Sequence, residues 1–270
     1  MSIMHLSFSQ AADPPYRPQR RSPLTRLQQY AIIFRMLLAE YRRTWFFHLI
    51  RSLLFPVAFV FLVKMTTTSA SREQSIFLSG GLLTTALAFG SLSTLIDKIG
   101  WSRQRHELDY WTALPIPKLA FILALMSICQ FFALPGLFGA YLLGSLILNM
   151  PLSGLLILSL LALVPLSSLS LAGLAAFLGS FAPNGQLANM IGNVMTIVIG
   201  FLSPMYIPLK ALPLPLRILA QFMPFTYSAD AFRAVLSASM PHLLMDILML
   251  CIFALVFLLL VHWKLDWRAS

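Results

Sequence analysis

The stretch from Phe201 to Leu236 reads FLSPMYIPLKALPLPLRILAQFMPFTYSADAFRAVL. Each of its prolines lacks a backbone N–H and resists continuation of a helix. These prolines stand at Pro204, Pro208, Pro213, Pro215 and Pro224. Polar and charged side chains follow the last of them, namely Thr226, Tyr227, Ser228, Asp230 and Arg233. We therefore expect residues 204–241 to form a hairpin of short, broken helices at a membrane edge, where protein or water covers the non-helical backbone.

Apolar segments flank this stretch on both sides and recur along most of the chain. Hydrophobic residues make up 59% of the 270 and charged residues only 10%, with a mean hydropathy of +0.82. This composition excludes an ordinary soluble domain and is typical of a polytopic membrane protein. Since about 20 apolar residues cross a bilayer, residues 46–263 are predicted to form an all-α transmembrane domain. Its six spans are expected at about 46–65, 76–96, 119–148, 152–181, 187–202 and 243–263.

The residues before the first span divide into two parts. Residues 1–23 contain Pro, Arg and Ser without periodicity, which predicts a disordered cytoplasmic tail. In residues 24–45, apolar side chains recur at three- and four-residue steps between arginines. This apolar stripe consists of Leu24, Leu27, Ala31, Phe34, Leu38, Tyr41 and Trp45. The pattern predicts an amphipathic helix in the membrane interface, or alternatively a helix that packs on a soluble partner.

The distribution of basic residues predicts the orientation. The chain has 19 Lys and Arg against 9 Asp and Glu, a formal net charge of +10. With six spans, most of these basic residues fall on the side that holds both termini and residues 97–118. Because cytoplasmic loops carry the excess of Lys and Arg, we expect the N-terminus and the C-terminal tail, 264–270, in the cytoplasm. Anionic lipid headgroups are the expected partner for this charge, rather than nucleic acid.

The largest charged segment between spans is residues 97–118, DKIGWSRQRHELDYWTALPIPK. Its centre, Gln104–Leu108, is polar and compatible with a helix, and Pro115 and Pro117 end the segment. We expect a helical element here that docks on a partner protein. The alternative is a solvated loop between spans.

Polar residues within the spans suggest further contacts. Asn189 and Asn193 are four residues apart and so share one face of the fifth span. Amides in hydrocarbon seek partners, so these two are expected to bond between helices or subunits, or to contact substrate. Arg51 lies about one turn inside the first span and is expected to extend to the lipid headgroups, with a substrate-facing role as the alternative. Asp246 lies near the start of the sixth span, where a carboxylate suggests a functional site or is simply hydrated near the headgroups.

The sequence shows no pattern for enzyme chemistry. It contains no G-x-x-x-x-G-K-[ST], so the chain cannot supply a P-loop for ATP. HELD at 106–109 lacks the second histidine of a zinc-protease motif, and Cys129 and Cys251 have no disulfide or metal-ligand spacing. We expect no catalytic residue, metal or cofactor in this chain, which is more consistent with a transport pathway.

Two sets of residues resemble one family. The first set lies in the hairpin and consists, in order, of Pro208, Leu212-Pro213, the PFTYSAD run from Pro224 to Asp230, and Arg233. It resembles the C-terminal signature of ABC exporter permeases of the drug-resistance and polysaccharide-export class, the ABC-2 type. Residues 97–118 resemble the cytoplasmic segment of the same family, in which Arg-Glu-x-Gly-Thr-x-Glu precedes a proline. Aligned on Pro115, Arg103 matches the arginine, while Gln104, His106, Glu107 and Asp109 replace Glu, Gly, Thr and the second Glu.

The resemblance implies two six-span permeases side by side in the bacterial inner (plasma) membrane, with two separate ABC ATPase subunits that bind ATP and Mg. It implies that 24–45 is a membrane-parallel elbow helix and that 97–118 is the loop that couples to the ATPase. The implied contact residues of that loop are Arg103, Gln104, Arg105, His106, Glu107 and Asp109. In the hairpin, Asp230 and Arg233 are one turn apart and are expected to pair.

The spans carry few charges, so we expect a hydrophobic or amphipathic substrate, which is drug-like, a lipid or a glycolipid. The Thr-Tyr-x-x-Asp-x-x-Arg ending resembles the daunorubicin-resistance-like drug-export branch more than the polysaccharide exporters. Three alternatives stay open: export of polysaccharide or a lipid-linked glycan, a stand-alone secondary transporter or channel, and a membrane scaffold or assembly factor.

Overall fold

The computed structural model describes residues 25–42, 44–66, 71–107, 110–111, 117–148, 154–202, 205–237 and 239–264. Over these residues the chain forms helices joined by turns, without a strand. The helices are α1 (Arg26–Tyr41), α2 (Trp45–Thr66), α3 (Arg72–Gln104), α5 (Lys118–Leu148), α6 (Gly154–Gly179), α7 (Gly185–Leu202), the 3-10 helix η1 (Leu209–Ala211), α8 (Leu214–Gln221), α9 (Pro224–Ser237) and α10 (Met240–Lys264).

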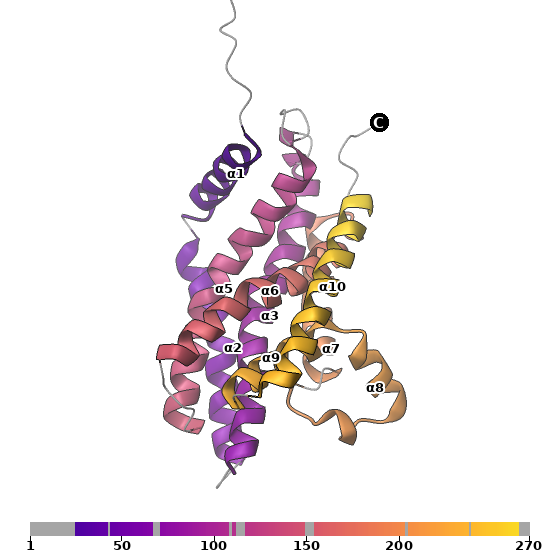
Figure 1. Ribbon diagram of the computed structural model, residues 1–270. Coiled ribbons are helices and arrows are strands. Elements are labelled where there is room, and N and C mark those ends of the chain that lie inside the picture. Colours follow the sequence, from indigo (N-terminus) through magenta and orange to yellow (C-terminus); the bar gives the residue numbers. More distant parts are fainter. Residues whose placement is uncertain are drawn as a thin grey trace, which may run out of the picture.

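The long helices lie side by side along one axis, with α6 crossing obliquely, and α1 and α8 lie at opposite ends (Figure 1). We call one end the α1 end: it holds α1, the last turn of α3, the first turn of α5 and the turn between α6 and α7. Lys118 donates a hydrogen bond to the carbonyl oxygen of His262, so the last turn of α10 is at this end too. We call the opposite end, formed by residues 205–237 and the first turns of α3, the hairpin end.

Helix α3 is the centre of the bundle. Its residues from Ser79 to Ile96 are buried almost without interruption. Small side chains make this possible because they let neighbouring helices approach closely. A Cβ added at Gly90 would lie 2.5 Å from Ala133 of α5, and one at Gly100 would lie 2.2 Å from Ala188 of α7. These small residues of α3 therefore pack directly against other helices.

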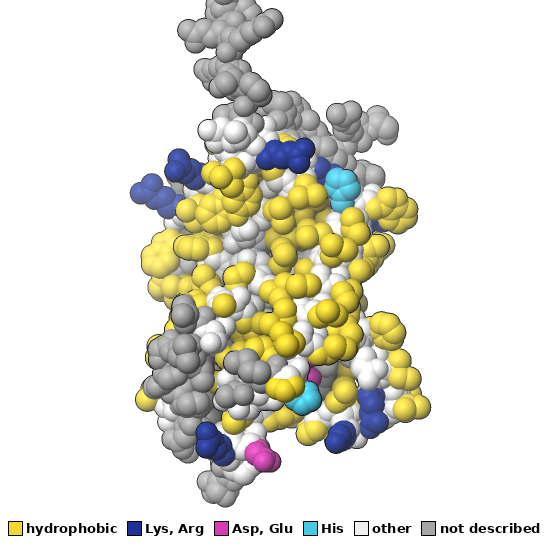
Figure 2. All heavy atoms as spheres, in the orientation of Figure 1, with side chains coloured by type: hydrophobic (Ala, Val, Ile, Leu, Met, Phe, Trp, Pro, Cys, Tyr) yellow, Lys and Arg dark blue, Asp and Glu magenta, His cyan; other side chains and the backbone are white. Residues whose placement is uncertain are grey.

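Within the described residues, four helices are long and apolar enough to cross a membrane. The four segments are Arg72–Gln104, Lys118–Ile147, Leu161–Gly179 and Pro241–Lys264. Figure 2 shows a broad band of hydrophobic side chains across the middle of the face in view, with Lys and Arg gathered toward the two ends. Helices α2 and α7 correspond to the first and fifth predicted spans, and their crossing of the membrane remains a prediction.

Several predicted boundaries differ from the structure. The second span was expected to end at residue 96, but α3 continues to Gln104, so the first part of the 97–118 segment is helix rather than loop. No proline interrupts residues 97–104, and polar side chains are compatible with a helix that leaves the membrane. The fourth span was expected to reach 181, but α6 ends at Gly179. Residues 240–241 of the predicted hairpin belong to α10.

The elbow segment 24–45 also differs from the prediction. Helix α1 ends at Tyr41, and Trp45 already begins α2. Its buried residues are Ile33, Leu37 and Tyr41, while Leu27 of the predicted stripe is 77% exposed. The segment is apolar on more than one face, so its spacing alone does not determine which face packs against α5.

Between α7 and α10 the chain forms the short helices η1, α8 and α9, as the prolines predicted, and the place of this hairpin at a membrane edge stays a prediction. A proline begins each short helix: Pro208 is the N-cap of η1, Pro213 the N-cap of α8, and Pro224 the first residue of α9. The first helical turn tolerates proline, whose missing N–H would lack an intrahelical partner there anyway. Pro215 lies in the first turn of α8, and Pro204 lies outside the described residues.

Candidate functional site

A lysine connects three parts of the α1 end. Lys98, in the last turns of α3, donates to Glu40 Oε1 of α1 at 2.6 Å and to Glu107 Oε2 at 3.1 Å. Ser102 Oγ also donates to Glu107 Oε2, at 2.8 Å. The Lys98 side chain is only 11% exposed, so solvent screens these interactions less than it would at the surface. Helix α1 is thus attached to the segment that leaves α3.

Arg103 and Gln104 fasten the end of α3 to the turn between α6 and α7. Arg103 Nη1 donates to the carbonyl oxygens of Ser180 and Ala182, at 3.1 and 2.8 Å. Gln104 Oε1 accepts a hydrogen bond from the backbone N–H of Gly185 at 2.9 Å. Both residues were predicted to contact a partner protein, and the structure shows them bonded within the chain.

Arg105 and His106 end α3 and point outward. The Arg105 side chain is 62% exposed and lies 3.7 Å from Glu107 and 5.4 Å from the centre of the Trp101 ring. His106 is exposed and has a φ of 56°, in the left-handed region that stops a helix and favours glycine. Of the predicted coupling residues, Gln104, Arg105 and His106 are exposed, while Asp109 lies outside the described residues.

The Glu107 carboxyl is held in its charged form. Burial raises its pKa, but the hydrogen bond from Ser102 and the positive charge of Lys98 lower it by more. The resulting pKa lies below the ordinary value of 4.5. The cluster at the α1 end therefore keeps its ion pairs at neutral pH and loses them in acid.

Arg233 is the centre of the hairpin end. Its Nε donates to the carbonyl oxygen of Phe77 in α3 at 3.1 Å, and its Nη2 donates to the carbonyl oxygen of Met205 at 2.7 Å. Its Nη1 bonds Asp230 Oδ1 at 2.6 Å, the pair expected from their one-turn spacing. The guanidinium carbon also lies 3.7 Å from the centre of the Phe77 ring. One side chain thus joins α9, α3 and the segment after α7.

Two glycines allow the hairpin to lie against α3. A Cβ at Gly80 would be 2.4 Å from Cγ of Arg233, and a Cβ at Gly81 would be 2.1 Å from the carbonyl oxygen of Met205. One turn further along α3, the hydroxyls of Thr85 and Tyr206 share a hydrogen bond of 2.5 Å. The start of the hairpin is therefore packed directly on the central helix.

Thr226 and Tyr227 stabilise the bend between α8 and α9. Thr226 Oγ1 donates to the carbonyl oxygen of Ala220 at 2.5 Å, and the Tyr227 hydroxyl donates to that of Gln221 at 3.0 Å. Carbonyl oxygens in the last turn of a helix have no backbone N–H of the same helix to bond. The hydroxyls of Thr226 and Tyr227 donate hydrogen bonds to two such oxygens at the end of α8. The polar residues of the signature thus act as structural links within the hairpin.

The two asparagines of α7 form one bonded chain with α3. Asn193 Nδ2 donates to Asn189 Oδ1 at 2.9 Å, and Asn189 Nδ2 donates to Asp97 Oδ2 at 3.4 Å. Asn189 therefore makes an interhelix contact, one of the alternatives that the sequence left open. Both asparagines are exposed in the single chain.

The charged residues expected inside spans are Asp246 and Arg51. Asp246 is 8% exposed in α10, and its Oδ2 has no hydrogen-bond partner among the described residues. An ion-coupled carrier would use a buried carboxylate of this kind. Arg51 belongs to α2, but its side chain is outside the described part of the chain.

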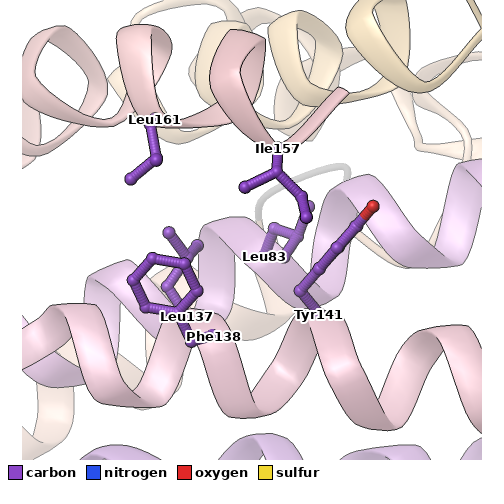
Figure 3. Close-up of a pocket in the computed structure, with 6 residues that line it drawn as sticks. All are labelled: Leu83, Leu137, Phe138, Tyr141, Ile157 and Leu161. Atoms are coloured by element: carbon purple, nitrogen blue, oxygen red, sulfur yellow. The ribbon is translucent and has the colours of Figure 1, made fainter. Parts of the chain in front are cut away.

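Two gaps in the interior of the bundle are small. Figure 3 shows one between α3, α5 and α6, where Leu83, Leu137 and Ile157 lie around a cavity of about 10 Å³. A second gap, next to Ile99 and Phe121, has the same volume. Such a volume holds about one water-sized sphere, so neither gap accommodates a hydrophobic substrate.

Sequence reasoning missed the partners that these residues find across the fold. Glu40 lies 58 positions from Lys98 in the sequence, and Phe77 lies 156 positions from Arg233. The adjacent glycines Gly80 and Gly81 were a usable signal, because paired small residues mark a place where another segment approaches a helix closely.

Comparison with known families gives one match that covers most of the described helices. The sequence model of a family described as ABC-2 type transporter matches residues 27–237, well over half of the chain. The matched region runs from α1 to the end of α9 and so includes both clusters described above. Among curated proteins, none matches the sequence.

Proposed function

Because this chain belongs to the ABC-2 type transporter family, whose members are the membrane components of ABC transporters, we propose that it exports a hydrophobic or amphipathic substrate together with a separate ATPase. The chain is a membrane-spanning permease subunit of an ABC transporter. ATP binding and hydrolysis, with Mg, would take place in the partner, because the chain has no P-loop.

The proposed architecture has six spans, formed by α2, α3, α5, α6, α7 and α10. An even number of spans places α1 and the end of α10 on the same side, in agreement with their shared position at the α1 end. The excess of Lys and Arg on that side favours a cytoplasmic α1 end. In this orientation α1 lies in the interface, as an elbow helix, and the hairpin caps the pathway outside.

Two copies of the permease are proposed to stand side by side with two ATPases. The support is twofold. The two described gaps in the interior of the bundle, between α3 and its neighbours, are far smaller than a substrate. Helix α7 exposes Asn189 and Asn193 along an apolar segment, and exposed amides in hydrocarbon gain hydrogen bonds from a neighbouring helix. The branch assignment, drug export of the daunorubicin-resistance type, rests on the residues of the hairpin signature alone.

The observation that carries the coupling proposal is the junction at the α1 end. Lys98 joins α1 to the end of α3, Arg103 joins α3 to the turn before α7, and Arg105 and His106 project beyond both links. A partner that pushes on this exposed tip acts on α1, α3 and α7 together. Coupling requires such an element with two arrangements whose balance ATP changes.

Co-purification tests this proposal. The tagged chain is expressed with an ABC ATPase encoded beside it and purified in mild detergent. We expect the ATPase in equal amount, with its loss or weakening in Arg105→Glu, and retention in Arg72→Glu, an exposed arginine at the hairpin end. Protein without ATPase that moves solute into liposomes without ATP would contradict the proposal and support a secondary carrier, with Asp246 as the first residue to neutralise.

A further inference from the structure

A groove opens between α1, α2 and α5 at the α1 end. Its volume is about 680 Å³, within the range of pockets that hold drug-sized ligands. Arg35 of α1 and Arg42, the C-cap residue of α1, line it, and the rest of its lining is apolar. The apolar part includes Trp45 at the start of α2 and two phenylalanines of α5, Phe131 and Phe138.

The two arginines suit an anion. They lie seven residues apart and so share one face of α1. Both are exposed, and neither side chain has a hydrogen bond or an ion pair with a described residue. No acidic residue is among those that line the groove in the described chain. A phosphate can accept several hydrogen bonds from guanidinium groups.

The apolar part extends from these arginines along the bundle. Phe131 and Phe138 are also seven residues apart and share a face of α5, and both are at least 40% exposed. Because a helix rises about 1.5 Å per residue, Phe138 lies about 10 Å further from the first turn of α5 than Phe131. Trp45, which is 51% exposed, stands beside the arginines, and tryptophan is enriched at membrane interfaces.

We propose that this groove binds an anionic phospholipid from the leaflet at the α1 end, with its phosphate between Arg35 and Arg42 and an acyl chain along Phe131 and Phe138. Charge complementarity favours this occupant over a second copy of the chain, because the groove is positive and the chain carries a net charge of +10. The site requires a membrane-embedded chain, but it depends neither on the transported substrate nor on the ATPase. It goes beyond the proposed transport function.

Native mass spectrometry of the purified full-length chain tests the site. Phosphatidylglycerol and phosphatidylcholine with identical acyl chains are titrated separately. We expect phosphatidylglycerol to bind more tightly, and Arg35→Gln with Arg42→Gln to weaken it by about thirtyfold, since each arginine near a membrane surface contributes about fivefold. The control, Arg26→Gln with Arg72→Gln, removes two exposed charges outside the groove and should leave binding unchanged.

Two further arms separate the occupants. Ala39→Trp fills the groove without changing its charge and should weaken binding of phosphatidylglycerol. Free glycerol phosphate, which lacks acyl chains, should not compete with phosphatidylglycerol for the site. A photoreactive benzophenone residue at Leu38 should form a lipid adduct in membranes. Equal binding of the two lipids, equal losses in the control, or a cross-link to a second copy at Leu38 would overturn the proposal. Each of these results leaves the ATPase test unaffected, so the two proposals fail separately.

Discussion

The two ends of α3 are fastened in different ways. At the hairpin end, one arginine, Arg233, bonds a carboxylate and two carbonyls from three segments. At the α1 end, the links are divided between Lys98 and Arg103, and Arg105 beyond them is exposed. Because Arg233 is the partner of all three segments, none of them can move without breaking a bond to Arg233, and the hairpin is a fixed cap. Separate links leave the α1 end able to change one contact at a time, as a junction with an ATPase would need.

The largest effect should come from removing the shared arginine. Arg233→Ala leaves two carbonyl oxygens and Asp230 without their donor, and should lower stability by about 3 kcal/mol, because a hydrogen bond to a charged group contributes about 1.5–3 kcal/mol. Thermal unfolding in detergent measures the loss. Arg72→Ala, an exposed arginine at the same end, is the matched control and should have little effect. Equal melting temperatures for Arg233→Ala and the wild type would mean that the hairpin is held by apolar packing alone.

The glycine pair tests whether close approach fixes the cap. In Gly81→Ala the new Cβ meets the backbone oxygen of Met205, so a cost of about 1–3 kcal/mol is expected from overpacking. Gly192→Ala, where the nearest atom is 3.5 Å away, should be neutral or slightly stabilising. Melting temperatures in the same detergent compare the two. If Gly81→Ala and Gly192→Ala lower the melting temperature equally, helix flexibility rather than contact with the hairpin explains why glycine stands at position 81.

A third substitution concerns the backbone that ends α3 at the α1 end. His106 has a positive φ, and the resembling family segment has glycine at this position. His106→Gly should therefore keep or slightly raise stability, whereas His106→Val should cost about 1–2 kcal/mol, because a β-branched residue resists the left-handed region. The two variants differ mainly in backbone preference. Equal stability of the glycine and valine variants would show that α3 ends differently in solution.

The smallest expected effect is the acid sensitivity of the α1 end. The folded-state pKa of Glu107 lies below 4.5, so its contribution is complete above about pH 4.5 and is lost as the pH falls through the folded value. Melting temperatures measured from neutral pH downward should fall more steeply for the wild type than for Glu107→Gln, by the equivalent of about 1 kcal/mol. Parallel curves would show that Lys98 is held by Glu40 without Glu107.

Some elements of the candidate site could be predicted because they depend on neighbours in the sequence. Prolines at Pro208, Pro213 and Pro224 predicted the breaks of the hairpin, and the structure places each at the start of a short helix. The one-turn spacing of Asp230 and Arg233 predicted their ion pair. Nothing local indicated that Arg233 would also bind Phe77 and Met205, which belong to other segments.

The expected roles of Arg103 and Gln104 show the same limit. Both lie in a charged segment that resembles a coupling loop, so a contact with a partner protein was the natural prediction. Their bonds to Ser180, Ala182 and Gly185 depend on the turn between α6 and α7 reaching the end of α3. The contact of Arg105 and His106 with an ATPase stays a prediction.

By itself, the sequence determined that this protein is a helical membrane protein with a broken-helix hairpin, because long apolar runs and prolines act through local backbone chemistry and the bilayer. Its signature residues also indicated the family. Only the tertiary structure decided that α3 is the buried centre, which face of α1 packs, and which carbonyls Arg103 and Arg233 bind. An apolar helix can bury any of its faces, and the choice depends on the shapes of helices far away in the chain.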